Sequence, residues 1–85
     1  MEQNLKFIET LTVEQFKNIT QVARIDIKRN PKTGLLFMVY GGKTGAVGKN
    51  QVPDNPMVSL VEGTDGSQFY MIHEEGKGAE TIVSF

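Results

Sequence analysis

The fold of this chain is decided by residues 24–40, which read RIDIKRNPKTGLLFMVY. The first six residues alternate charged and aliphatic side chains, which is the pattern of a half-buried β-strand. Asn30–Gly34 is a turn sequence, and Leu35–Tyr40 then runs for six residues without a charge. The stretch predicts a β-hairpin with a basic first strand and a second strand that is apolar on both faces.

The hairpin register decides which of these side chains face the core. A five-residue loop over Asn30–Gly34 pairs Ile27 with Phe37 and directs Phe37 inward. The outer face of the second strand then holds three apolar residues, namely Leu36, Met38 and Tyr40. A shift of one residue would exchange the two faces, so every inference about this surface depends on the register.

A short helix is expected before the hairpin. Thr12 is followed three residues later by Gln15, which is a capping box that satisfies two free amides at a helix start. The sequence therefore predicts a helix over about residues 13–20. Residues 3–10 fit the periodicity of a strand and of a helix face; we favour a short strand, and the pattern leaves both open.

Further strands are expected after the hairpin. Gly41–Gly48 is glycine-rich and is expected to hold a short, irregular strand around residues 44–47. Asp65-Gly66 is a hairpin signal between two apolar runs, and one more run closes the chain. These three runs are Met57–Val61, Gln68–His73 and Thr81–Phe85.

The elements together predict a single small domain over residues 1–85, of the α+β or mostly-β class. Five to six short antiparallel strands form a curled sheet or small open barrel, with the one helix near the N-terminus. Barrels of the SH3 or OB kind have similar strand counts, and this is an analogy of architecture alone.

Charge is distributed unevenly along the chain. The net charge of −1 divides into −2 over residues 1–16, +6 over residues 17–53 and −5 over residues 54–85. Such a division can mark a basic binding face, although opposite charges within one small fold can also simply neutralise each other. There is no cysteine, which excludes a disulfide frame and a thiolate metal site.

Known catalytic and cofactor motifs are absent from the sequence. The glycine-rich stretch fails the Walker pattern at both Gly-Lys pairs, and His73 is the one histidine. Ser59, His73 and Asp65 could be drawn as a triad, but no nucleophile-elbow motif surrounds the serine. We expect a protein that is not an enzyme and has no cofactor, no bound metal and no small-molecule substrate.

Targeting and membrane signals are also absent. The start Met1-Glu2-Gln3-Asn4 lacks the basic and apolar regions of a signal peptide, and no apolar run approaches the length of a membrane span. We therefore expect a soluble, cytoplasmic protein.

Two functions fit the sequence. The first is an interaction domain that self-associates, or docks on another protein, through an apolar sheet face; the candidate residues are Leu36, Met38, Tyr40 and Tyr70. The alternative is a nucleic-acid-binding module that combines cations with an aromatic ring; the candidates are Arg24, Lys28, Arg29, Lys32, Tyr40, Lys43 and Lys49. Whether the helix or another subunit covers the second apolar face is left open.

Overall fold

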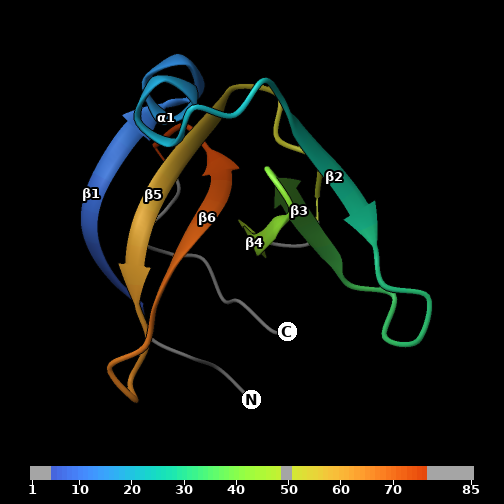
Figure 1. Ribbon diagram of the computed structural model, residues 1–85. Helices are drawn as coiled ribbons and strands as arrows, with labels where there is room; N and C mark the ends of the chain where they lie inside the picture. Colours follow the sequence, from blue (N-terminus) through green and yellow to red (C-terminus); the bar gives the residue numbers. More distant parts are fainter. Residues whose placement is uncertain (1–4, 49–50, 77–85) are drawn as a thin grey trace.

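A computed structural model describes residues 5–48 and 51–76. Within this part of the chain, the strands are β1 (Lys6–Thr12), β2 (Ile25–Arg29), β3 (Leu36–Tyr40), β4 (Lys43–Val47), β5 (Pro56–Glu62) and β6 (Gln68–Glu74), and the helix is α1 (Val13–Thr20). The six strands form one mixed sheet in the order β1-β5-β6-β4-β3-β2. The sheet is curled, with β1, β5 and β6 standing opposite β2, β3 and β4 (Figure 1). The predicted class, a mostly-β domain with a curled sheet and one short helix, is confirmed.

One pair of strands departs from the expected antiparallel arrangement. β4 and β6 are parallel, with Ala46 opposite Met71 and Val47 opposite Ile72. The expectation rested on tight turns, which join consecutive strands only. β4 and β6 are separated in sequence by β5, so the chain between them is long enough to reverse its direction.

α1 separates β1 from β2, the two edge strands of the sheet, along the chain. β1 pairs with β5, β2 pairs with β3, and the alternation of directions across the sheet makes β1 and β2 run the same way. Counted as one broken strand, they give the connectivity of an OB-type Greek-key barrel. The all-antiparallel SH3 type does not fit, because β4 and β6 are parallel.

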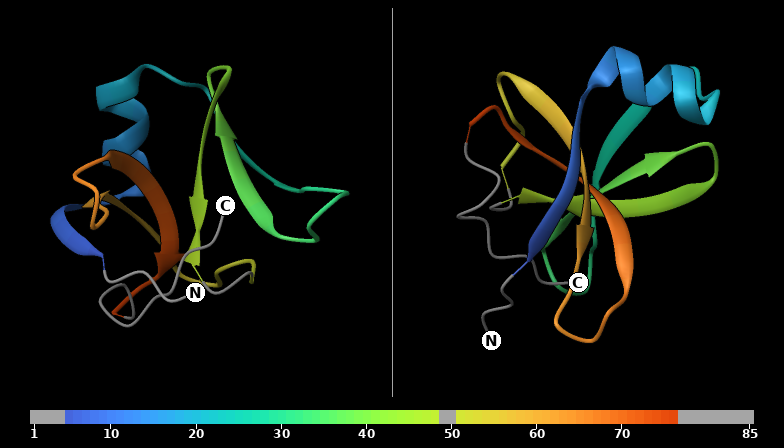
Figure 2. Two further views of the ribbon diagram at one scale, coloured as in Figure 1. Left: turned by 90° about the horizontal axis from the view of Figure 1, so that it is seen from below. Right: turned by 90° about the vertical axis from the view of Figure 1, so that its left-hand side faces the viewer.

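α1 begins where the sequence predicts. The Thr12 hydroxyl accepts a hydrogen bond from the Gln15 amide at 3.1 Å, and the Gln15 side chain accepts one from the Thr12 amide at 3.0 Å. The helix ends at Gln21, which adopts a left-handed conformation with φ of 63°. α1 lies across the end of the sheet beside β1 and β5 (Figures 1 and 2). Two turns of helix are unstable alone, so this packing is what maintains α1.

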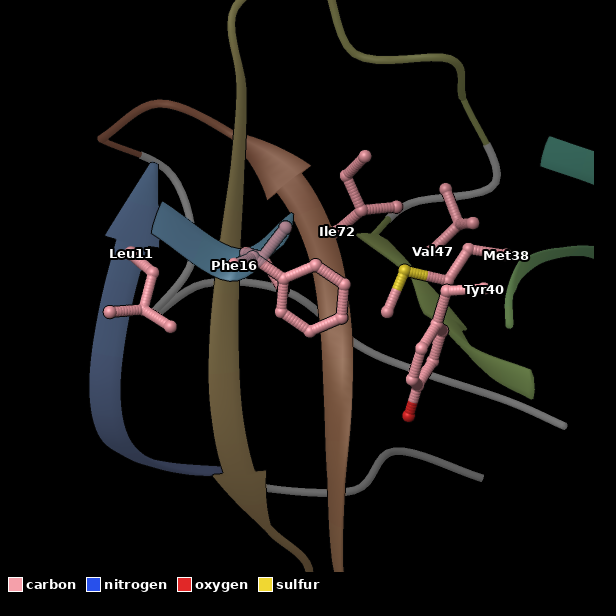
Figure 3. Packing of buried hydrophobic residues seen from close by; sticks show 7 residues of the cluster. Leu11, Phe16, Met38, Tyr40, Val47 and Ile72 are labelled. Atoms are coloured by element: carbon pink, nitrogen blue, oxygen red, sulfur yellow. The ribbon is translucent and has the colours of Figure 1, made fainter. Parts of the chain in front are cut away.

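The main core fills the space between the two halves of the sheet. Phe16 from α1 is fully buried there and contacts the rings of Tyr40 and Tyr70, which also contact each other. Figure 3 shows side chains from β1, α1, β3, β4 and β6 converging on this space. The buried members of the cluster are Leu11, Phe16, Met38, Tyr40, Val47, Val58 and Ile72. A second, smaller cluster lies on the outer face of the sheet and has Ala46, Val61 and Met71 at its centre.

The predicted register of the β2–β3 hairpin is wrong by one residue. Arg29 pairs with Leu36 rather than with Leu35, and Ile27 pairs with Met38 rather than with Phe37. The loop therefore has six residues, Asn30–Leu35. The longer loop is closed by backbone hydrogen bonds from Asn30 N to Leu35 O and from Gly34 N to Asn30 O, each 2.8 Å long. Met38 consequently points into the core and Phe37 points outward.

Two further predictions about the strands are confirmed. Residues 6–12 form a strand, and the Asp65-Gly66 hairpin is present between β5 and β6. The predicted strand Thr81–Phe85 lies outside the described residues. No helix in the described part of the chain is long and apolar enough to cross a membrane.

Gly45 provides a test of the packing between β4 and its neighbours. A Cβ atom at this position would lie 2.5 Å from Cε of Met38 and 2.6 Å from the backbone oxygen of Tyr70. The methionine can move, but the backbone of β6 cannot retreat without disturbing the parallel pairing. We predict that Gly45→Ala lowers the free energy of unfolding by about 1–3 kcal/mol, as measured by urea denaturation.

The matched control for Gly45→Ala is Thr44→Ala, at the exposed neighbouring position on the same strand. It should change the free energy of unfolding by less than about 0.5 kcal/mol. Equal stabilities of the two variants would contradict the close approach of β6 to Gly45.

Candidate functional site

Charged side chains in the described residues divide between the two sides of the sheet. Residues 24–47, which form β2, β3, β4 and their loops and are here termed the basic half, carry five cations and one carboxylate. Residues 51–76, which contain the β5–β6 hairpin, carry five carboxylates and no lysine or arginine. The uneven charge along the chain therefore becomes an uneven charge in space.

Five of the predicted cations lie together on the basic half, and all five are exposed: Arg24, Lys28, Arg29, Lys32 and Lys43. The one carboxylate in this region, Asp26, is neutralised by Arg24 through an ion pair of 3.1 Å. The Arg29 guanidinium donates a hydrogen bond to the carbonyl of Gly34, which ties the start of the loop to its end. Lys49, the remaining predicted cation, lies outside the described residues.

The predicted apolar interface is not at the surface. Met38 is 0% exposed and Tyr40 is 8% exposed, because the actual register turns both into the core. Leu36 and Tyr70 are half-buried and pack against the same cluster. Tyr40 therefore cannot serve as the predicted stacking ring; burial, together with the charge of the nearby Tyr70, raises the pKa of its hydroxyl.

The register places a different set of residues on the outer face of β3 and β4. Leu35, Phe37 and Thr44 lie beside an open pocket of about 260 Å³, which is completed by Asn30, Thr33, Leu36 and Gly45. Phe37 is half-buried, and its partner across the hairpin is the exposed Lys28. A five-residue loop turns Phe37 inward, so the sequence did not predict Phe37 at this surface.

The loop that borders this pocket has a defined shape. The Asn30 side-chain oxygen accepts hydrogen bonds from the amides of Lys32 at 2.9 Å and Thr33 at 3.4 Å, and the Thr33 hydroxyl accepts one from the Leu35 amide at 3.3 Å. These local bonds replace the strand pairing that the loop lacks. The loop projects away from the rest of the chain (Figures 1 and 2).

The glycine-rich stretch forms a turn and a strand. Gly41 and Gly42 have φ angles of 54° and 82° and make the two-residue turn between β3 and β4. Lys43 and Thr44 then start β4, so no helix N-terminus follows the glycines as a phosphate loop requires.

Two members of the hypothetical triad do meet, but in the interior. Ser59 Oγ lies 2.7 Å from His73 Nε2 and 2.9 Å from Thr10 Oγ1, while His73 Nδ1 lies 2.9 Å from the carbonyl oxygen of Glu74. Since that oxygen accepts only, Nδ1 carries the proton and the Ser59 hydroxyl donates to Nε2. Ser59 is 0% and His73 3% exposed, which leaves a substrate no access.

Asp65, the third member of the triad, belongs to the β5–β6 turn. Its carboxylate accepts hydrogen bonds from the Ser67 hydroxyl at 2.6 Å and from the Ser67 amide at 3.0 Å, and these bonds lower its pKa. It is engaged in the turn rather than with His73. Among the described residues, no group of three or more His, Cys, Asp or Glu side chains could hold a metal ion.

Comparisons with known proteins return no relative: no family model, no curated protein and no solved structure matches the chain.

The Thr10–Ser59–His73 network is expected to act in stability alone. Ser59→Ala leaves the buried His73 nitrogen without its donor and should lower the free energy of unfolding by about 1–3 kcal/mol. Ser67→Ala, at an exposed turn position, should cost less. A serine-directed fluorophosphonate should leave the folded protein unlabelled, as measured by mass spectrometry. Covalent labelling of Ser59 would show instead that the pair is a reactive nucleophile and base.

Proposed function

We propose that the chain is a nucleic-acid-binding module that holds the phosphate backbone on its basic half. The observation that carries the proposal is the presence of five exposed cations in the basic half, on β2, on β4, in the β2–β3 loop and directly before β2, with the one carboxylate among them already paired. Cations in this arrangement neutralise phosphates and release the counterions condensed on the polymer.

The carboxylates of the β5–β6 hairpin limit where the ligand can lie. They are absent from the basic half, so a polyanion is attracted to one side of the curled sheet and repelled by the other. A net charge of −1 therefore does not oppose binding, because local charge at the contact sets the interaction within about 10 Å. The OB-type connectivity is compatible with this function, since such barrels often bind oligonucleotides, but connectivity alone assigns no function.

The test is a pair of charge reversals at exposed strand lysines. Lys28→Glu changes β2 in the basic half, and Lys6→Glu makes the same change on β1. We predict that Lys28→Glu weakens the binding of a fluorescent oligonucleotide of about 16 nucleotides at least fivefold, while Lys6→Glu has little effect. Fluorescence anisotropy measures both affinities.

Salt provides the second readout of the same experiment. The wild-type affinity should fall steeply between about 50 and 200 mM salt, and the slope should be smaller by about one for Lys28→Glu. Absence of binding at about 50 mM salt, or an equal loss in the two variants, would overturn the proposal.

A second candidate function is self-association. The proposed contact surface is the outer edge of β1 rather than the apolar face that the sequence predicted. Among the described strands β1 has one neighbour, β5, so no described strand pairs with its other edge. Ile8 is 45% exposed on this strand, and antiparallel pairing of two copies about residues 7 and 8 would set Lys6 opposite Glu9 of the second copy. The proposed assembly is a dimer with two-fold symmetry.

Ile8→Lys tests this dimer, because it places a charge at the centre of the pairing, opposite Phe7 of the second copy. We predict that light scattering gives a dimer for the wild-type protein and a monomer for Ile8→Lys. Ile19→Lys is the control, since Ile19 is 60% exposed on α1, away from the edge. A wild-type monomer at high concentration would remove the candidate.

A further inference from the structure

The pocket beside the β2–β3 loop combines an apolar wall with unused polar groups. Leu35, Leu36 and Phe37 supply the wall, and Gly45 completes the lining. The Thr44 hydroxyl and the side-chain nitrogen of Asn30 make no hydrogen bond to the described part of the chain. A flat ring with polar edges fits such a lining, since the wall contacts its face and the polar groups its edge.

The size of the pocket limits the ligand. At about 260 Å³ it lies below the roughly 300–1,000 Å³ of sites for drug-sized molecules. It accommodates one small ring system, and it is open, so that a ring attached to a longer chain can enter.

The charge around the pocket identifies what the ring is attached to. Lys28 lies across the hairpin from Phe37, Arg29 precedes Asn30, and Lys32 follows Asn30 by two residues. Three exposed cations are therefore neighbours, by strand pairing or in sequence, of residues that line the pocket. An apolar ring inside this rim, with anionic groups on either side of it, is the chemistry of a base within a phosphodiester chain.

We propose that this pocket receives one unpaired base of a single-stranded nucleic acid, so that the module binds single strands in preference to duplex. The inference rests on the proposed binding of nucleic acid and specifies its class. Phe37 contacts the face of the base, Thr44 and Asn30 bond its edge, and the neighbouring cations hold the adjoining phosphates. A base in a duplex is stacked and paired, and it cannot enter the pocket without leaving the helix.

The experiment separates contributions of base and backbone. Anisotropy is measured with an oligothymidylate of about 16 nucleotides, with an abasic oligomer of the same length and charge, and with a blunt duplex. Stacking of one base on an aromatic ring is worth about 1–3 kcal/mol, so the oligothymidylate should bind about 5- to 150-fold more tightly than the abasic oligomer. The duplex should bind no more tightly than the abasic oligomer.

Variants of the pocket give the second arm. Phe37→Leu keeps an apolar side chain and removes the ring, so it should reduce the advantage of the oligothymidylate to less than about twofold without changing the abasic affinity. Val39→Leu is the control on the same face of β3, outside the pocket lining. Thr44→Val removes the hydroxyl at an exposed position and should alter the ranking of thymidylate against adenylate oligomers.

Each outcome decides one question. Equal affinities for the oligothymidylate and the abasic oligomer, tighter binding of the duplex, or an unchanged ratio in Phe37→Leu would overturn the capture of a base and leave backbone binding intact. Failure of all three ligands to bind would overturn the proposed function itself. Salt-independent binding of an apolar peptide in the pocket would identify a protein partner instead.

Discussion

The packing of one helical phenylalanine holds the two halves of this sheet together. The Phe16 ring centre lies 5.1 Å from that of Tyr40 on β3 and 4.9 Å from that of Tyr70 on β6, both in edge-to-face geometry. The two strands belong to opposite sides of the curl, whose backbones are joined by the short β4–β6 pairing, and the Tyr40 and Tyr70 rings also contact each other, with their centres 6.2 Å apart. Phe16 therefore completes a core that the open sheet alone would leave exposed. Aromatic pairs of this kind contribute about 0.5–1.5 kcal/mol each beyond the area they bury.

The position of α1 between β1 and β2 in the chain explains why Phe16 can contact both sides of the sheet. The helix interrupts what would otherwise be one long strand, so β1 ends on one side of the curl and β2 begins on the other. The capping box at Thr12 and the left-handed Gln21 fix both ends of the interruption. The same break leaves β1 and β2 as the two edges of the sheet.

Local patterns predicted the elements well, because their causes are local. The capping box marked the start of α1, the alternation marked β2, and Asp65-Gly66 marked the β5–β6 turn. The predicted hairpin register was wrong because it depends on whether Leu35 belongs to the strand or to the loop. Every residue from Leu35 to Tyr40 is apolar, so the sequence pattern does not mark where the strand begins. That single residue moved Met38 and Tyr40 inward and Phe37 outward.

The residues of the candidate site were likewise predictable only in part. The exposed cations could be predicted from the sequence, because lysine and arginine side chains are almost never fully buried. The outward position of Phe37 could not be predicted, since it depends on the hairpin register. The parallel β4–β6 pair was also out of reach, because it arises from three strands packing together and not from any turn.

The two surfaces proposed for binding lie at opposite ends of the strand order. β1 is one edge of the sheet and β2 is the other, with four strands between them. A dimer formed through β1 would leave the β2 edge of each copy unpaired. The two proposals therefore use different edges of the sheet: the cations beside β2 would bind a polyanion, and β1, with Lys6 and Glu9 complementary across a two-fold axis, would pair with a second copy.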